Sequence, residues 1–352
     1  MFSKFGATVV TFDKSNLKSI IQNLNKGRVL VIGDFAIDEM IYGQTHRISR
    51  EAPVLILKHT HTNIILGTAS NAAHNIASLS SDRVATIGVY GEDYYGPILL
   101  DALNKARIDT SHMVLDPSRV TTTKTRISGS STQSVTQQIV RIDREINACV
   151  NSNTETKIID NINKCAHEFD AILLSDYGIG VMTQNVIDAA IQAAKKHNMF
   201  IAVDAQTDLT RFQGVTVITP NQPEAERTLG YELKDHETLI KGGKELLEKT
   251  SSEMILITRG SEGMILFERN GNITSIPAFN KTDVFDVTGA GDTVVGTFTL
   301  GLCSGVKGSE CMFLGNLAAS IVVRHFGSAT TTIYELTETI DKLNIENMSL
   351  KV

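Results

Sequence analysis

The chain alternates between short apolar runs and longer amphipathic stretches over most of its length. The run RVLVIGD at residues 28–34 is continuously apolar and ends in Gly-Asp, which is typical of a buried parallel strand. The other strands predicted for the same sheet are 84–91, 171–176, 200–205, 215–220 and 253–260. Apolar residues at helical spacing predict helices at 14–26, 67–79, 93–106, 154–168, 183–197, 222–230 and 235–249. This alternation predicts an α/β fold in which a doubly wound, mostly parallel sheet is flanked by helices.

Two β-rich stretches do not fit the alternation. Residues 39–43 and 52–59 are apolar and strand-like, and 121–129 and 136–145 alternate around the turn sequence SGSSTQS. We expect them to form a small separate β-sheet that projects as a lid, with strands from about 39–65 and 119–143. The predicted organisation is a helical extension at 1–27 followed by one domain at 28–352 that contains this insertion.

Composition and charge narrow the classes of partner. The 352 residues are 42% hydrophobic and 20% charged with a net charge of −6, and no basic tract occurs. These values argue against nucleic acid or an anionic membrane as a partner. No apolar run approaches the roughly 18 residues of a membrane span, and the N-terminus lacks a signal-like pattern, so we expect a soluble, cytoplasmic protein. The four cysteines lie at no metal-binding spacing, and we expect buried free thiols at Cys149, Cys165, Cys303 and Cys311.

The segment DVTGAGDT, at residues 286–293, is the strongest candidate for chemistry. The N-terminus of a helix presents unpaired N–H groups, and glycines let an anion approach them, so Gly289, Ala290 and Gly291 predict an anion hole for a phosphoryl group. Asp292 cannot itself bind a phosphate, but it can accept a proton from an attacking hydroxyl as a general base. Taken alone, the segment is equally consistent with a glycine-rich turn whose acidic residue is favoured by the helix dipole.

The whole set of motifs resembles the ribokinase-like (PfkB-type) carbohydrate kinases, from about residue 28 to the end. Within that family the resemblance is strongest to the heptose 7-phosphate kinases, which form half of a bifunctional enzyme of ADP-heptose and lipopolysaccharide synthesis. The stretches that carry it are VIGDFAIDEMIYG, RISREAPVLILK, TASNAAHNIASL, TTTKTRISG, QQIVRIDRE, LLSDYGIGVM, TPNQPEAE, ITRGSEGM, VFDVTGAGDT and NLAASIVV. The resemblance implies a ribokinase-like fold and an ATP-dependent phosphotransferase with an alcohol group as acceptor.

The resemblance also implies roles for individual residues on the nucleotide side. It makes Asp292 the catalytic base and Gly289–Gly291 the anion hole. Glu224 is expected to hold Mg²⁺, with water between them; the alternative is a glutamate that stabilises the first turn of a helix. The residues expected to bind ATP are Asn221, Thr258, Gly260, Gly263 and Asn316. For Asn316 an ordinary polar position on a helix is an equal alternative.

On the sugar side the resemblance implies a larger set. The expected substrate-binding residues are Asp34, Asp38, Gly67, Asn71, Lys124, Arg126 and Asp176. Carboxylates suit sugar hydroxyls, although Asp34 and Asp38 can also cap a helix. Lys124 and Arg126 alternate onto one face and suit a substrate phosphate, or else mark a solvated strand edge. Asp286 and Thr288, with the loop at Gly327 and Ser328, resemble the family's site for a monovalent cation such as K⁺.

Three positions depart from the heptose kinase pattern. Leu66 stands where we expect the first of two glycines at a hinge, and Ile179 and Gln206 replace two lysines. Losing each cation near a phosphate would weaken binding about tenfold to a hundredfold. An unphosphorylated sugar or a nucleoside is therefore an alternative substrate. No HxGH-bearing nucleotidyltransferase segment follows, so we expect a stand-alone kinase.

The expected activity is transfer of phosphate from ATP, with Mg²⁺, to the anomeric hydroxyl of D-glycero-D-manno-heptose 7-phosphate. A relative that binds sugar or nucleotide without catalysis is a third hypothesis, and the retained Asp292, Asn221 and Glu224 argue against it. Exposed strand edges on the lid predict a homodimer that forms through the lid.

Overall fold

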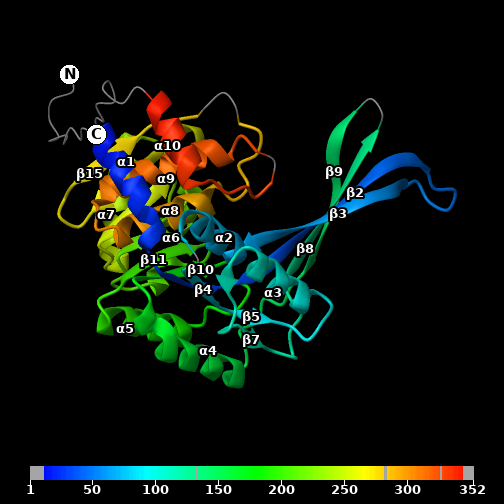
Figure 1. Cartoon of the computed structure of the whole chain (residues 1–352), viewed down its shortest axis with the longest axis horizontal. Coiled ribbons are helices and arrows are strands. Elements are labelled where there is room, and N and C mark those ends of the chain that lie inside the picture. The colour runs from blue at the N-terminus through cyan, green and yellow to red at the C-terminus, as the bar shows by residue number, and fades with distance from the viewer. Residues whose placement is uncertain (1–11, 82, 132–133, 281–283, 326, 344–352) are drawn as a thin grey trace.

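A computed structural model describes residues 12–343, apart from 82, 132–133, 281–283 and 326, and its centre is a nine-stranded sheet (Figure 1). In spatial order the strands are β15 (Ile273–Ile276), β14 (Met264–Glu268), β13 (Met254–Thr258), β12 (Val217–Ile218), β11 (Phe200–Ala205), β10 (Ala171–Asp176), β1 (Val29–Gly33), β4 (Val84–Ile87) and β6 (Ile108–Asp109). The strands from β6 to β13 pair in parallel, and β14 and β15 pair antiparallel at one edge. The predicted doubly wound, mostly parallel sheet is therefore confirmed.

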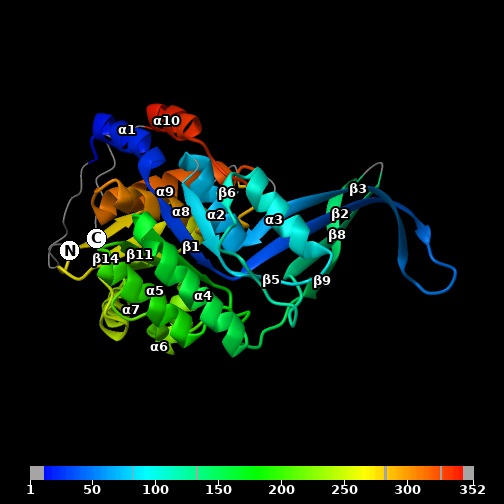
Figure 2. The same ribbon diagram turned by 60° about the horizontal axis from the view of Figure 1, so that its bottom comes forward.

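Helices cover both faces of this sheet, as Figure 2 shows. On one face lie α1 (Lys14–Asn23), α2 (Ala69–Leu79), α3 (Tyr95–Lys105), α8 (Ala290–Cys303), α9 (Gly308–Val322) and α10 (Ile333–Lys342). On the other lie α4 (Ser152–Cys165), α5 (Gln184–Lys196), α6 (Gln222–Leu229) and α7 (His236–Thr250). Because side chains alternate along a strand, Val29 and Val31 of β1 pack with the first group, and Leu30 and Ile32 pack with the second.

A second sheet projects away from this core (Figure 1). We call it the lid sheet, and its strand order is β3 (Leu55–Thr68), β2 (Phe35–Ile48), β8 (Thr123–Ser131) and β9 (Ser134–Arg144). The small separate sheet was predicted, but β2 and β3 are much longer than the sequence pattern indicated. Main-chain hydrogen bonds between β2 and β3 keep the polar stretch around Gln44 extended. The alternation of apolar residues in the sequence does not indicate this pairing.

Smaller differences have local causes. The predicted strand at 84–91 is divided into β4 and β5 (Val89–Tyr90), which pairs with β7 (Val114–Leu115). Between β4 and β5, Gly88 lies so close to Phe35 that a Cβ atom there would be 2.2 Å from the ring. The prediction lacked β14, β15 and α10. Short 3₁₀ helices occur at η1 (Leu24–Lys26), η2 (Ala166–Glu168), η3 (Leu209–Arg211) and η4 (Gly260–Glu262).

The segment expected to be an N-terminal extension packs onto the core. Leu17 and Ile21 of α1 are buried in the same apolar cluster as α8 and α9, and Lys14 Nζ donates to the carbonyl of Asp341 at 2.7 Å. Of the four free cysteines, Cys165 and Cys311 are buried as expected, whereas Cys303 is partly buried and Cys149 is exposed. Among the described residues no helix is both long and apolar enough to cross a membrane.

Candidate active site

The helix α8 begins at a left-handed glycine beside the carboxyl ends of β1, β10 and β11. Gly289 has φ 76°, and a Cβ atom there would lie 2.4 Å from Asn71 Nδ2, so both the turn and the packing require glycine. The N–H of Ala290 donates to the carbonyl of Val287 at 3.2 Å. The N–H groups of Gly291 and Asp292 make no hydrogen bond within the described part of the chain. Of the expected Gly289–Gly291 set, the N–H of Ala290 is thus used within the turn, whereas the N–H groups of Gly289 and Gly291 have no hydrogen-bond partner among the described residues.

Asp292 lies buried in the first turn of α8, with both carboxylate oxygens held by side-chain donors. Asn71 Nδ2 donates to Oδ2 at 2.6 Å, and the Tyr177 hydroxyl donates to Oδ1 at 3.1 Å. Burial raises the pKa of Asp292 to about 6, against the two hydrogen bonds, which lower it. Each carboxylate oxygen can accept two hydrogen bonds, so lone pairs remain for a substrate hydroxyl.

Asn71 was expected to bind substrate, but its amide nitrogen is used on Asp292. Its orientation is fixed from behind, because Asn75 Nδ2 donates to the Asn71 carbonyl at 3.0 Å and approaches Asn71 Oδ1 at 3.3 Å. The Thr293 hydroxyl in turn donates to Asn75 Oδ1 at 2.7 Å. The network therefore ties α2 to the first turn of α8 and keeps an N–H donor facing Asp292.

A second pair of carboxylates lies near the base. Burial raises the pKa of Asp204, at the end of β11, well above its ordinary value, and the charges of Asp292 and Glu224 add to the effect. Burial also raises the pKa of Glu224. Glu224 forms the capping box of α6, since Glu224 Oε2 accepts from the N–H of Asn221 at 2.8 Å and Asn221 Oδ1 accepts from the N–H of Glu224 at 2.9 Å. The structural alternative for Glu224 is thus realised, while its second oxygen stays available.

This anionic cluster fits a divalent cation. In the described residues no three Asp, Glu, His or Cys side chains converge to bind a metal directly. Mg²⁺ takes one or two carboxylates plus water and phosphate oxygens, so Asp204 and Glu224 fit a hydrated ion bound with a triphosphate. Asp204 was missed in the sequence, although its place at the end of a parallel strand could have indicated it.

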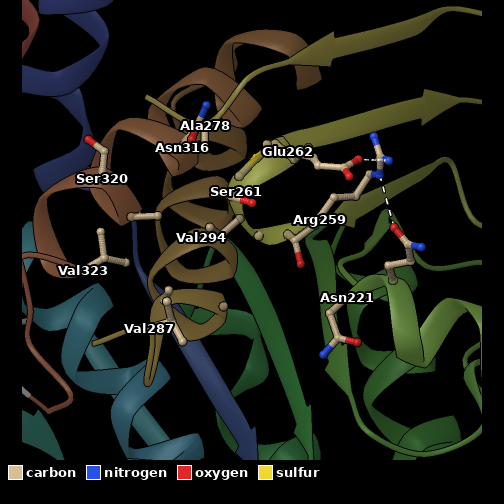
Figure 3. A pocket seen from close by; sticks show the side chains of 18 of the residues that line it. Asn221, Arg259, Ser261, Glu262, Ala278, Val287, Val294, Asn316, Ser320 and Val323 are labelled. Carbon is tan, nitrogen blue, oxygen red and sulfur yellow. Dashed lines mark hydrogen bonds and ion pairs between the residues drawn. The ribbon is translucent and has the colours of Figure 1, made fainter. Parts of the chain in front are cut away.

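A cavity of about 610 Å³ lies on the other side of the α8 N-terminus. Ala290 and Gly291 line it. So do all the residues expected to bind ATP, which are Asn221, Thr258, Gly260, Gly263 and Asn316. Its apolar side includes Val287, Val294 and Val323, which lie across the cavity from Asn221 in Figure 3. Asn316 Nδ2 donates to the carbonyl of Pro277 at 2.7 Å, which fixes that side chain on the wall. A cavity with an apolar side, next to unpaired N–H groups, suits a nucleotide.

The lid sheet contributes charged residues close to Asp292. Arg126 Nη2 lies 3.4 Å from Asp38 Oδ2, and Lys124 Nζ lies 5.5 Å from the centre of the Tyr177 ring. Asp38 Oδ1 is buried and has no hydrogen-bond partner among the described residues. Gly67 permits this packing, because a Cβ atom there would be 3.1 Å from the Asp38 carboxyl carbon. The orphaned oxygen is a ready acceptor for a sugar hydroxyl.

Asp34 and Asp176, also expected to bind substrate, are not brought to the open face. Asp34 is fully buried and accepts the N–H groups of Tyr177 at 2.8 Å, Ile179 at 3.3 Å and Val181 at 3.2 Å. Its pKa is raised to about 6 by burial and by the nearby Asp176. The buried Asp176 forms an ion pair with the partly exposed Arg211 at 2.9 Å. Both aspartates hold the loop that follows β10.

The departures from the family pattern have different structural consequences. Leu66 packs into the core. The strained backbone lies two residues later, at Thr68, which has φ 51° and ψ −133°. Ile179 is buried, and Gln206 is exposed, with its carbonyl accepting from Arg227 Nη1 at 2.6 Å.

The loop expected to hold a monovalent cation is folded on itself. Asp286 Oδ1 accepts from the N–H of Thr288 at 2.9 Å, and Oδ2 accepts from the N–H of Gly327 at 3.0 Å. Ser328 lies next to Gly289, where a Cβ atom would be 3.4 Å from the Ser328 hydroxyl. The expected segments are therefore brought together beside the mouth of α8.

Comparison with known proteins identifies this arrangement. A model of the pfkB family carbohydrate kinases matches residues 26–333. The chain belongs to that family. Membership makes it a phosphotransferase that uses a sugar hydroxyl as acceptor.

Relatives and solved structures agree with this membership. The chain is 38% identical over 325 residues to the "Bifunctional protein HldE" of Geobacter sulfurreducens, which covers 92% of this chain and 65% of the relative. The protein of that name from Aliarcobacter butzleri is 36% identical over 323 residues. The chain thus spans about 65% of the first relative's length. Whether it acts as a stand-alone kinase stays a prediction.

Similarity in structure extends further than similarity in sequence. Escherichia coli phosphofructokinase-2, in complex with substrates and products, has a TM-score of 0.71 at 17% identity and covers 90% of this chain and 99% of that one. Arabidopsis thaliana ribokinase, complexed with ribose and ATP, has a TM-score of 0.67 at 17% identity. The ribokinase-like fold is therefore confirmed.

Proposed function

We propose that this chain transfers the γ-phosphoryl group of ATP to the anomeric hydroxyl of D-glycero-D-manno-heptose 7-phosphate, which gives the 1,7-bisphosphate. The observation that carries the proposal is the place of Asp292, buried between the cavity lined by Gly291 and the lid carboxylate of Asp38. The likeness to the HldE proteins and the segments RISREAPV, TTTKTR and SDYG favour a heptose phosphate over other sugars.

In this reaction Asp292 accepts the proton of the sugar hydroxyl as its oxygen forms a bond to the γ-phosphorus and the bond to ADP breaks. The free N–H groups of Gly291 and Asp292 stabilise charge on the transferring group. Asp204 and Glu224 would hold Mg²⁺, which neutralises charge on the phosphates when bound. Asp38 accepts a sugar hydroxyl and fixes the orientation of the acceptor.

The lid supplies the cations for a substrate phosphate. Lys124 forms no ion pair among the described residues, and Arg126 is bound only by the long contact to Asp38. These two side chains support recognition of the 7-phosphate although Ile179 and Gln206 replace the usual lysines. An unphosphorylated sugar is the second candidate, favoured by those two replacements.

An ADP-release assay with ATP and Mg²⁺ tests the proposal across heptose 7-phosphate, free heptose, ribose, fructose, fructose 6-phosphate and adenosine, with Asp292→Asn as control. We expect strong turnover on heptose 7-phosphate, lost in the variant. Turnover restricted to an unphosphorylated sugar would move the substrate within the family. Binding of ATP without turnover on any acceptor would favour a non-catalytic binding protein.

We also propose that two copies pair through the lid sheet. The strand β9 lies at an edge of that sheet and exposes 44% of Ile139 and 43% of Ile142, which are apolar surfaces unusual for a free edge. Sedimentation of the full chain should give a dimer, and Ile142→Lys should shift it toward the monomer. An unchanged monomer in both would contradict the proposal.

A monovalent cation is the remaining proposal for this site. The backbone turn held by Asp286 supports it, as does the name of one similar structure, phosphofructokinase-2 in complex with potassium. Turnover should rise when tetramethylammonium is replaced by K⁺ at constant ionic strength, and equal rates would contradict a requirement.

A further inference from the structure

Tyr177 is the first residue after β10, and its hydroxyl donates to Asp292 Oδ1 at 3.1 Å. It was not among the residues expected in the site. Asn71 holds the other oxygen of the same carboxylate. The Asp292 carboxylate therefore has one donor from α2 and one from the residue after β10. Only Asn71, the donor on α2, is also bonded to Asn75.

The main chain at Tyr177 is held by two buried aspartates, Asp34 and Asp176. Its N–H donates to Asp34 Oδ2 at 2.8 Å, and the next residue, Gly178, turns with φ 74° while its N–H donates to Asp176 Oδ1 at 2.9 Å. The two buried aspartates thus set where the ring starts. This explains what the carboxylate of Asp34 does at the end of β1, away from the open face.

The ring of Tyr177 meets the lid. Lys124 Nζ of β8 lies 5.5 Å from the ring centre, within the range of a cation–π contact. The same side chain thus contacts the base with its hydroxyl and the lid with its ring. This contact joins β8 to the residue that donates to Asp292.

The Tyr177 hydroxyl keeps its proton, and so stays a donor, at neutral pH. Burial and the negative charges of Asp292 and Asp204 raise the pKa of Tyr177 well above its ordinary value. Tyr177 is therefore not itself a base in the neutral range, and its proton points to the carboxylate.

We propose that Tyr177 is a positioning residue that orients the Asp292 carboxylate for proton transfer and links that orientation to the lid through Lys124. The proposal rests on the proposed sugar kinase function. With Oδ2 held by Asn71 and Oδ1 held by Tyr177, the carboxylate cannot rotate, and the remaining lone pairs point where the acceptor hydroxyl arrives. Without the hydroxyl, only the hydrogen bond from Asn71 to Oδ2 would restrict rotation about the Cβ–Cγ bond of Asp292.

The first test compares Tyr177→Phe with a matched control. Tyr231→Phe removes a hydrogen bond of the same kind, from the Tyr231 hydroxyl to Glu245 Oε2 at 2.9 Å, at a place remote from Asp292. We expect Tyr177→Phe to lower kcat about tenfold to a hundredfold, as for one hydrogen bond to a charged group, with the KM for ATP unchanged. Tyr231→Phe should leave both constants unchanged. A kcat for Tyr177→Phe within twofold of the wild type would overturn the proposal.

A third variant separates the ring from the hydroxyl. Tyr177→Leu removes both, so it should raise the KM for the sugar in addition to lowering kcat, because Lys124 loses the surface on which it rests. If Tyr177→Phe and Tyr177→Leu were equally impaired in KM with kcat intact, Tyr177 would be part of the wall of the sugar site and the positioning role would be wrong.

A spectroscopic arm needs no substrate. In protein labelled with ¹³C at aspartate carboxyls, the Asp292 resonance is assigned by its loss in Asp292→Asn and recorded near pH 8. Tyr177→Phe should shift it and Tyr231→Phe should not. If the wild type phosphorylated none of the sugars, the proposed function would fail while this resonance would still decide the inference. An unmoved resonance in folded Tyr177→Phe would overturn it.

Discussion

Asp34 and Asp292 look alike in several respects and differ in the one that matters for chemistry. Each follows a glycine, each is buried, and burial raises the pKa of each to about 6. Asp34 is surrounded by main-chain donors from a single loop, whereas Asp292 has two side-chain donors and lies next to the nucleotide cavity. A raised pKa therefore does not identify a base. The kind of donor and the access to substrate do.

The largest expected effect is on Asp292. Asp292→Asn keeps an oxygen for one donor, and its amide can donate to the Tyr177 hydroxyl, so the fold should persist. Removal of a general base should lower kcat about 10² to 10⁴-fold. Steady-state kinetics with ATP binding by calorimetry checks this, and a variant that binds ATP yet retains more than a tenth of the wild-type kcat would contradict the assignment.

The pH dependence should report the same carboxylate. Asp292 acts when ionised, and its pKa is raised from 3.8 to about 6, so activity is lost as the pH falls through about 6. Below that value kcat/KM should fall about tenfold per pH unit. The pH profile of Asp34→Asn should show the same fall of kcat/KM below about pH 6. If kcat/KM of the wild type fell only near pH 4, the pKa of Asp292 would not be raised by burial.

Two glycines of one turn should separate folding from catalysis. A methyl group at Gly291 meets no atom within 4 Å, whereas at Gly289 it would clash with Asn71 in a left-handed backbone. Gly291→Ala should retain or gain stability, by up to about 1 kcal/mol, yet lose at least roughly tenfold in kcat because the methyl group lies where the phosphoryl group approaches. Gly289→Ala should lower the free energy of unfolding by about 1–3 kcal/mol. Denaturant titrations beside kinetics test the pair, and equal behaviour would contradict this division.

The smallest effect on activity is expected at Asp34. Asp34→Asn replaces one acceptor oxygen by an NH₂ group that faces N–H donors of the 177–181 loop, so at least one N–H loses its partner. The free energy of unfolding should fall by about 1–3 kcal/mol, with a smaller loss of kcat than in Asp292→Asn. Chemical denaturation measures it. A loss of kcat equal to that of Asp292→Asn with unchanged stability would return Asp34 to the catalytic set.

The sequence was informative where a local pattern determines the structure. Buried strands and the helix that starts at Ala290 follow from apolar runs and turns. The residues from Asn221 to Asn316 were expected together from family motifs, and the structure brings them into the lining of one cavity. The long hairpin of β2 and β3 does not, because it is held by main-chain pairing across solvated residues.

The partners of buried polar groups were equally hidden. Tyr177 reaches Asp292 across 115 positions of sequence, and Asn71 reaches it across 221. Such contacts depend on tertiary packing, so the sequence could nominate Asp34, Asp38 and Asp292 together without showing that main-chain N–H groups of the 177–181 loop enclose Asp34. Asp204 was overlooked because only the folded structure brings its strand end close to Asp292 and Glu224.

The most direct test of the central claim is the ³¹P NMR spectrum of a reaction of the chain with ATP, Mg²⁺ and heptose 7-phosphate. We predict a new phosphate monoester resonance coupled to the anomeric proton, which grows with ADP while the 7-phosphate signal persists, and which Asp292→Asn fails to produce. Formation of ADP and inorganic phosphate alone, or a new phosphate that is not coupled to the anomeric proton, would contradict the account.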